Sequence, residues 1–412
     1  MKRQYFLLIV IAGGIIGVLT LLFFIFSNPY ERLNPPEPQV PAQIAQELPP
    51  IADQAVDTEL ISALTKETIG VTTGIDGLRL VFYDKSDSKI KVSEYDGTGE
   101  QELSDTLLGV EAMGVAPTKE KAWLRLTDPE TSEAITLVYD FRVKEAVRLE
   151  NGIQTIDWSP DGLELVYFVE RQGAAPALKI VEANGIEPRT VRDNFSVQDP
   201  VIDWYGQDAL AYWLAPSSTR PSSTISLTTR GANAVQLAPE GIAQQVKFSP
   251  DGQFALIGQN NPDSGKPQLL LGVTAERDLQ VLPLTTWLDK CTWLDDSARI
   301  LCFVPRNLPG GFTYPEDDDG SLDYGDQLWV IDAATAKPQL IYDVPQTIKD
   351  ARDPFASQNG SRLNFLIRPD GVLASLDLTD KLVAPTIPSE NTNQTNTANT
   401  ANTANSPGGS TD

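Results

Sequence analysis

Trp158-Ser159-Pro160-Asp161-Gly162 returns along the chain as Phe248-Ser249-Pro250-Asp251-Gly252, and a short apolar run follows each copy. Degenerate copies begin at Trp204 and Trp293. The four aromatic residues are separated by 46, 44 and 45 residues, which is the repeat length of a four-stranded propeller blade. Each apolar run is expected to form the second strand of its blade. The spacing therefore predicts a β-propeller.

Three weaker copies complete the array. They are Gly74-Ile75-Asp76-Gly77, Ala116-Pro117-Thr118-Lys119 and Gln358-Asn359-Gly360, and each precedes another strand-like run. Together with the four clear copies they predict an all-β fold with a single propeller of seven blades, six or eight blades being the alternatives. The terminal copies depart most from the pattern, as expected where the end blades must close the ring.

The motif and the strand that follows it resemble the TolB-type, WD40-like propeller repeat, and the resemblance extends from about residue 68 to 384. It implies that the aromatic residue before Ser-Pro-Asp-Gly packs between adjacent blades. In this chain those residues are Trp158, Trp204, Phe248 and Trp293. Asp161 and Asp251 are expected to accept local backbone hydrogen bonds in their turns. We expect neither a TolB role nor peptidase activity, because the sequence shows neither the additional domain of TolB nor that of prolyl-oligopeptidase relatives.

An apolar segment precedes the repeats. The 22 residues from Tyr5 to Phe26 carry no charge. With a rise of about 1.5 Å per residue, a helix of this length can cross a hydrocarbon core of about 30 Å. We therefore expect an uncleaved transmembrane helix at 5–26. A cleaved signal peptide is the competing interpretation, but its apolar part usually has about 7 to 15 residues.

The charges beside this span predict its orientation. Lys2 and Arg3 lie before it, so the positive-inside rule leaves the stub 1–4 in the cytoplasm and everything after the span outside. This predicts a single-pass protein of the plasma (inner) membrane with an extracytoplasmic propeller. Gly13 and Gly17 form a GxxxG step through which two such helices can associate, ordinary lipid-facing glycines being the alternative.

The segments on either side of the propeller have biased compositions. Seven prolines between residues 28 and 50 favour an extended spacer. Apolar spacing from 51 to 66 fits one short amphipathic helix, so the linker is expected at 27–66 and the propeller at 67–384. The tail 385–412 is rich in Asn, Thr and Ala and has almost nothing apolar to bury, so we expect it to be disordered.

Composition excludes several functions. The net charge is −24, from 32 basic and 56 acidic residues, and a chain this acidic repels nucleic acid. Histidine is absent from the sequence, which excludes Ser-His-Asp, Cys-His and HExxH chemistry. Catalysis by paired carboxylates, or by Lys and Tyr side chains, remains open.

Two cysteines, Cys291 and Cys302, flank one predicted hairpin. If Trp293 pairs with Ala298, the two cysteines lie diagonally across the strands. A register two residues looser places them directly opposite each other, and both registers keep them on one face. A disulfide and two reduced, packed thiols are therefore both open.

One segment, Pro305 to Gly325, interrupts the period. We expect it to join the second and third strands of its blade, on the face that carries the blade-to-blade connections, where propellers generally bind their ligands. Phe312, Tyr314 and Tyr324 in this segment are candidate ligand-binding residues, and packing of their rings over the blade edge is the alternative.

The same segment contains part of a calcium-binding pattern. The carboxylates that fall at positions 3, 5, 9 and 12 of a calcium loop are Asp317, Asp319, Asp323 and Asp326. Gly320 falls where such a loop turns sharply, but Pro315 occupies the first ligand position and the last ligand is Asp instead of Glu. The pattern therefore predicts an incomplete Ca2+ site, with an acidic surface loop as the alternative.

These observations favour a membrane-anchored extracytoplasmic propeller that binds a protein, peptide or glycan of the cell envelope as an adaptor or scaffold. We expect no enzymatic activity and no cofactor apart from the Ca2+ considered above. One alternative is a carboxylate-dependent enzyme that acts on polysaccharide. The other is a structural envelope protein that calcium stabilises.

Overall fold

The computed structural model describes residues 60–382 except 75, 129–130, 172, 196 and 233. The chain divides into two compact units, Met1–Asp57 and Thr58–Asp412, and the described residues belong to the second. The expected span at 5–26 with Gly13 and Gly17, most of the linker and the tail lie outside them. Within the described part, no helix is long and apolar enough to cross a membrane.

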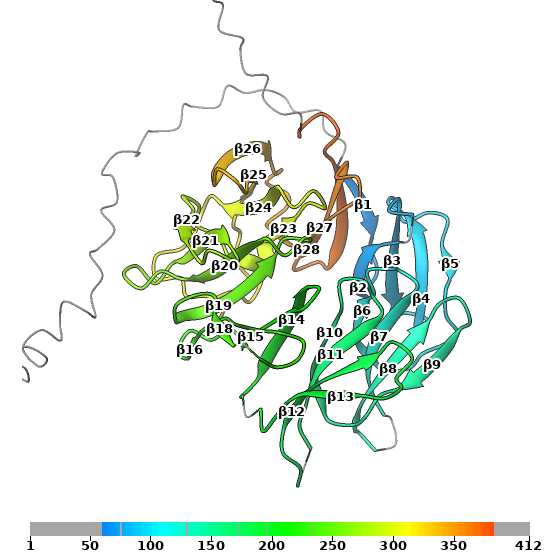
Figure 1. Cartoon of the computed structure of the whole chain (residues 1–412). Coiled ribbons are helices and arrows are strands. Elements are labelled where there is room, and N and C mark those ends of the chain that lie inside the picture. The colour runs from blue at the N-terminus through cyan, green and yellow to red at the C-terminus, as the bar shows by residue number, and fades with distance from the viewer. Residues whose placement is uncertain are drawn as a thin grey trace, which may run out of the picture. The chain divides into compact units, whose positions relative to one another are not determined.

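Seven antiparallel sheets follow one another along the described chain (Figure 1), so the predicted seven-bladed propeller is confirmed. Blades 1 to 4 consist of β2 (Thr68–Thr73), β3 (Arg79–Asp84), β4 (Lys89–Glu94) and β5 (Gln101–Glu102); β6 (Val110–Val115), β7 (Lys121–Thr127), β8 (Ala134–Asp140) and β9 (Glu145–Arg148); β10 (Ile153–Trp158), β11 (Glu164–Val169), β12 (Ala177–Glu182) and β13 (Arg189–Asp193); and β14 (Pro200–Gly206), β15 (Ala209–Leu214), β17 (Ile225–Leu227) and β18 (Val235–Gln236).

Blade 5 gains a fifth strand, β16, from the second-to-third loop of blade 4. A single turn of 3-10 helix, η1 (Leu288–Lys290), leads into blade 6. Blades 5 to 7 consist of β16 (Pro221–Ser222), β19 (Gly241–Phe248), β20 (Phe254–Asn260), β21 (Pro267–Val273) and β22 (Leu279–Val281); β23 (Cys291–Trp293), β24 (Arg299–Pro305), β25 (Asp326–Asp332) and β26 (Lys337–Asp343); and β27 (Asp350–Ala356), β28 (Arg362–Arg368), β29 (Val372–Asp377) and β1 (Leu60–Leu64).

The first described strand closes the ring. β1 pairs antiparallel with β29, so the last blade takes its outer strand from the start of the propeller. The helix expected at 51–66 is therefore wrong for residues 60–64, and the propeller begins before residue 67. The physical reason is that β29 would otherwise expose a row of unpaired backbone groups. Leu64 is buried against Leu80 and Phe82 of blade 1, which seals the joint between the last and first blades.

The turn after the first strand has the same pair of backbone hydrogen bonds in six blades. In blade 3 the Ser159 N–H donates to the carbonyl of Glu164 at 2.9 Å, and the Gly162 N–H donates to the carbonyl of Ser159 at 2.8 Å. Asp161 accepts a backbone N–H at 3.0 Å and the Ser159 hydroxyl at 2.7 Å, and Asp251 does the same in blade 5. Their predicted role as turn residues is confirmed. The six turns begin at Gly74, Ala116, Ser159, Ser249, Leu294 and Ser357.

The aromatic residue before this turn lies between two blades, as the repeat implied. The four residues are Trp158, Trp204, Phe248 and Trp293, and all are buried. The indole N–H of Trp158 donates to the carbonyl of Gly114 in blade 2 at 2.8 Å, and that of Trp293 donates to the carbonyl of Lys247 in blade 5 at 3.1 Å. Each of these two rings thus joins its own blade to the preceding one.

Cys291 and Cys302 form a disulfide across β23 and β24. They lie directly opposite each other, and Trp293 pairs with Ile300, so the hairpin has the looser of the two registers considered. Both cysteines are fully buried.

Replacing Gly252 with Ala tests how tightly the repeated turns pack. Gly252 has a φ of +71°, and a Cβ there would lie 2.4 Å from the Tyr205 carbonyl oxygen of blade 4. We expect Gly252→Ala to lower the free energy of unfolding by about 3 kcal/mol, since the left-handed backbone alone costs about 1–2 kcal/mol and the contact adds to it. Urea denaturation measures the change.

Gly265 provides the matched control, because its φ is +69° and a Cβ added there would have nothing within 4 Å. Gly265→Ala should therefore lose only the backbone contribution. Equal losses in the two variants would show that contact between successive turns adds nothing to stability.

Candidate functional site

The insertion between β24 and β25 joins the second and third strands of blade 6, as predicted. Its candidate ligand-binding residues Phe312, Tyr314 and Tyr324 are buried. Their rings surround Trp287, which lies in the connection between blades 5 and 6, with centroid distances of 5.3, 5.7 and 5.2 Å. The structure therefore brings the three residues together, as a small core that packs the insertion onto the propeller.

A buried lysine lies beneath this core. The Nζ of Lys290 is fully buried and donates to Asp326 at 2.7 Å, to Asp350 at 2.6 Å and to the Ala351 carbonyl at 3.1 Å. Burial lowers the pKa of Lys290, and the two carboxylates oppose that shift. Burial likewise raises the pKa of Asp326, which Lys290 opposes. The cation and the two carboxyl groups are all buried, and the contacts among them offset the cost of removing their charges from water.

Arginines of blade 7 hold the other side of the insertion. Asp318 forms ion pairs with Arg352 and, at 2.8 Å, with Arg368. Both arginines also bind Asp350, each through Nε at 3.0 Å. The guanidinium of Arg352 lies 4.6 Å from the ring centroid of Trp287. The insertion is therefore fixed to β27 and β28 by charge as well as by packing.

The four candidate calcium ligands are distributed over this segment. Asp317 and Asp319 accept backbone N–H groups of the insertion itself at 2.6 and 2.8 Å, Asp323 is not buried, and Asp326 binds Lys290. Among the residues that the structure describes, no group of three or more Asp, Glu or Cys side chains is placed to hold a metal ion. Calcium binding by the insertion stays a prediction.

The structure also brings together two carboxyl groups that the sequence did not single out. Asp157 and Asp203 lie on β10 and β14, the first strands of neighbouring blades, which face the central channel of a propeller. Asp157 accepts the backbone N–H of Trp204 at 2.8 Å. Burial raises the pKa of Asp157 to about 6, and burial together with the charge of Asp157 raises the pKa of Asp203 well above its usual range.

A repeat-based signal for this pair exists in the sequence. The residue immediately before the repeat aromatic is ionisable in three successive blades, as Asp157, Asp203 and Lys247. First strands line the channel, so an ionisable residue at this position lies near the propeller axis in each blade. Comparing the repeats position by position would therefore have found the pair.

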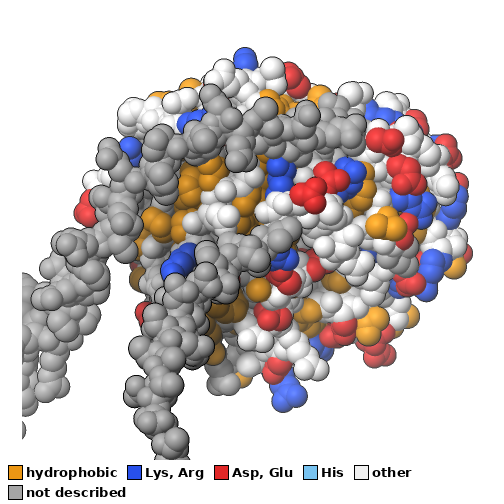
Figure 2. Space-filling model, turned by 90° about the horizontal axis from the view of Figure 1, so that it is seen from above, with side chains coloured by type: hydrophobic (Ala, Val, Ile, Leu, Met, Phe, Trp, Pro, Cys, Tyr) orange, Lys and Arg blue, Asp and Glu red, His pale blue; other side chains and the backbone are white. Residues whose placement is uncertain are grey.

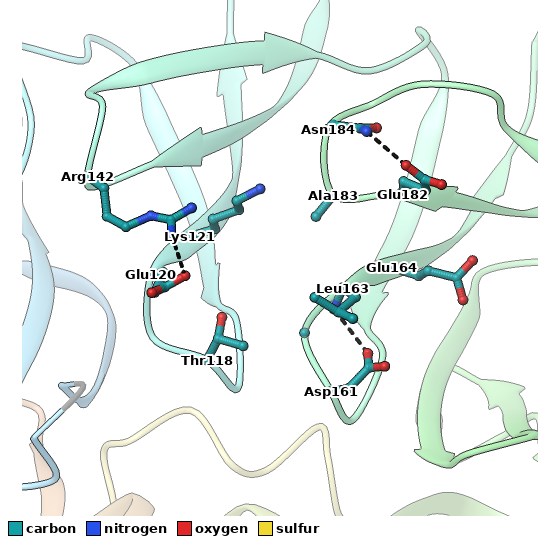
Figure 3. A pocket seen from close by; sticks show the side chains of 11 residues that line it. Thr118, Glu120, Lys121, Arg142, Asp161, Leu163, Glu164, Glu182, Ala183 and Asn184 are labelled. Carbon is teal, nitrogen blue, oxygen red and sulfur yellow. Dashed lines mark hydrogen bonds and ion pairs between the residues drawn. The ribbon is translucent and has the colours of Figure 1, made fainter.

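An open groove of about 610 Å³ lies between blades 2 and 3 (Figure 3). It is built from the turns after the first and third strands of both blades. Since neighbouring strands are antiparallel, these turns lie on the face opposite the insertion. The lining residues are Thr118, Glu120, Lys121, Arg142, Asp161, Gly162, Leu163, Glu164, Glu182, Ala183 and Asn184.

On the blade 2 wall of this groove, the basic side chains pair with acidic side chains of the same blade. Arg142 pairs with Glu120 and with Asp140, at 3.0 Å in each case, and Lys121 lies 3.8 Å from Asp140. The hydrogen bond and charge of Asp140 raise the pKa of Arg142, so this guanidinium stays protonated. The two cations and two carboxylates of this wall therefore balance.

The blade 3 wall keeps its negative charge. Glu182 accepts a hydrogen bond from the neutral amide of Asn184 at 2.8 Å, and Glu164 has an ion pair only at 3.8 Å, with Arg189. The Ser159 hydroxyl lowers the pKa of Asp161, so that carboxyl group is ionised at neutral pH. Figure 3 shows these acidic side chains on the wall opposite Lys121 and Arg142.

Exposed apolar residues lie in the turns that form the groove or close to them in the chain. Leu163 lines it and is 62% exposed. Val143 follows Arg142, Ile186 follows the turn of Asn184, and both are exposed, as is Val147. Exposed hydrophobic side chains are not confined to this groove, since they also lie among acidic and basic ones on the face drawn in Figure 2. The groove thus combines an acidic wall with an apolar rim.

No protein-family model matches this chain, and no curated protein matches it. Solved structures do. An oligogalacturonate lyase in complex with manganese has a TM-score of 0.56 at 12% identity, covering 78% of this chain and 90% of its own. The oligogalacturonate lyase from Vibrio parahaemolyticus has a TM-score of 0.54 at 11% identity, covering 79% and 92%. This likeness supports the propeller fold. TolB from Acinetobacter baumannii is less similar, with a TM-score of 0.40 at 12% identity over 75% of this chain and 78% of its own.

Replacing Lys290 with Met tests the buried ionic cluster. The substitution leaves Asp326 without its cation in a buried site, while Asp350 keeps Arg352 and Arg368. We therefore expect the free energy of unfolding to fall by about 3–5 kcal/mol. Lys85→Met is the control, because Lys85 forms an exposed pair with Glu67 at 3.3 Å and should lose at most about 1 kcal/mol. Denaturant titration of both variants measures the difference, and equal midpoints would contradict the role given to Lys290.

Replacing Asp157 with Asn tests the carboxyl pair through pH. Between about 3.9, the usual pKa of Asp, and about 6, the unfolded chain releases this proton while the folded chain retains it. Ionisation of Asp157 therefore costs the folded state stability as pH rises through that window. The amide oxygen of the substituted side chain can still accept the Trp204 N–H, so the stability of Asp157→Asn relative to the parent should grow between pH 4 and 7. A difference that stays constant with pH would contradict the raised pKa.

Proposed function

We propose that this protein is an extracytoplasmic binding module, tethered to the plasma (inner) membrane, that holds a protein, peptide or glycan of the cell envelope in the groove between blades 2 and 3. The observation that carries the proposal is the groove itself. It is open to solvent, its acidic wall is not neutralised from within, and apolar side chains surround it. Exposed apolar groups beside uncompensated charge favour association with a partner of complementary chemistry.

Two features support the proposed location. The uncharged span from Tyr5 to Phe26 follows Lys2 and Arg3, the arrangement typical of an anchor with a cytoplasmic N-terminus. The Cys291–Cys302 disulfide belongs with this location, since disulfides form and persist in oxidising compartments outside the cytoplasm. Both features favour a propeller that works on the outer side of the membrane.

A carboxylate-dependent enzyme that acts on polysaccharide is the second candidate. Asp157 and Asp203 favour it, because a carboxyl group with a pKa near 6 can serve as a general acid close to neutral pH. The matched lyases are named for oligogalacturonate, which is itself acidic, so this carboxyl pair would repel such a ligand whenever both groups were ionised. Release of new chain ends from an envelope polysaccharide would favour this candidate over a binding module.

Photocrosslinking in living cells tests the binding module. A photoreactive phenylalanine analogue replaces Asn184 inside the groove, or Asp263 in an exposed turn of blade 5 as a control, in the full-length chain. We expect illumination to give an adduct with one envelope component at position 184 and none at position 263, and mass spectrometry of the adduct identifies the partner. Identical adducts at both positions, or none at position 184, would overturn the assignment of the groove.

A further inference from the structure

We infer that the segment that enters the groove is an extended peptide, with one basic side chain directed at blade 3 and a large apolar side chain a few residues away. This inference rests on the proposed function and adds the chemistry of the partner to it. Three observations carry it: the uncompensated charge of one wall, the exposed apolar residues beside the groove, and an adjoining apolar pocket on the other side of blade 2.

The charge of the groove selects a cation. The bases of the blade 2 wall are already paired with their own acids, so they add little net attraction for an anion. On the blade 3 wall, Glu182 has a neutral hydrogen-bond partner and Glu164 has a cation only at 3.8 Å. A Lys or Arg side chain placed there would supply the missing charge.

A second cavity adjoins the groove. A pocket of about 240 Å³ lies between blades 1 and 2, and Glu120 and Arg142 line both this pocket and the groove. Its lining includes four apolar side chains, which are Val81, Val92, Leu103 and Phe141. The ion pair of Glu120 with Arg142 therefore lies between an acidic site on one side and an apolar site on the other.

An acidic site followed by an apolar site suits a polypeptide ligand. An extended chain can place a basic side chain at Glu164 and Glu182 and an apolar one in the pocket between blades 1 and 2. Leu163 at the rim offers further apolar contact to such a chain. An amino sugar or a polyamine would satisfy the acidic wall but has no large apolar group for the second pocket, so both serve as outcomes of the test.

The full-length protein in lipid nanodiscs is titrated into fluorescein-labelled synthetic peptides with one arginine and one phenylalanine at varied spacing, and anisotropy reports binding. At the best spacing we expect Glu164→Gln with Glu182→Gln to weaken binding about tenfold. Replacing arginine with uncharged citrulline should cause a similar loss, and the two changes together should cost little more than either alone.

Glu240→Gln with Asp263→Asn is the matched control, since both residues are exposed and lie outside the groove, and their replacement removes the same total charge. This control should bind as the parent does. Several results would overturn the inference: equal binding of the citrulline peptide, equal weakening by the control variant, or tighter binding of a chitosan oligosaccharide or a polyamine than of any peptide.

The outcomes also separate this inference from the proposed function. If the component crosslinked at position 184 contacts the groove through a neutral or acidic segment, the function stands and the peptide chemistry is wrong. If arginine peptides bind as described but cells give no adduct specific to position 184, the chemistry of the groove stands and the proposed function is wrong.

Discussion

The contact between successive turns is the constraint on which the propeller depends. The glycine that ends such a turn has a positive φ, and a Cβ added to it would lie against the preceding blade. An added Cβ would lie close to Thr118 at Gly162, to Tyr205 at Gly252, and to Gln358 of blade 7 at Gly77 of blade 1. The buried aromatic residue just before the turn fixes the same joint from the inside. A short local motif therefore sets the position of whole sheets relative to one another.

The two faces of the ring use charge differently. On the insertion face, Lys290 and Arg352 are buried together with Asp350, which both of them bind, next to the rings around Trp287. On the opposite face, where the turns after the first and third strands lie, the carboxylates between blades 2 and 3 remain open to solvent. Buried pairs of the first kind stabilise one arrangement of the chain, whereas surface carboxylates that have no close cation leave negative charge exposed to solvent.

Features that repeat along the chain could be predicted from the sequence. Features that depend on contacts between distant segments could not. The period of the aromatic residues is sufficient for seven blades, and the spacing of Cys291 and Cys302 limits their pairing to two registers. The strand at 60–64 escapes prediction because Leu-Ile-Ser-Ala-Leu suits a helix as well as an edge strand, and only β29 decides between them. Asp326 resembles a calcium ligand in the sequence because its buried partner Lys290 lies 36 residues earlier in the chain.

The candidate site was the least predictable part for the same reason. The groove between blades 2 and 3 is assembled from four turns, and its net charge depends on which pairs form within each wall. Composition gives an acidic chain but not the location of the acids that are left without a cation. The resemblance to propeller repeats could not supply this information either, since a repeat specifies the scaffold and leaves the turn surfaces variable.

The closing strand β1 has a mechanical consequence. It leads back to the residues that precede the propeller, and its hydrogen bonds to β29 run across the strand axis. A pull transmitted from that side would load all of these bonds together in shear, instead of peeling them apart one by one. In the membrane-tethered arrangement proposed above, such a closing strand would let the propeller resist drag from a bound partner without opening its ring.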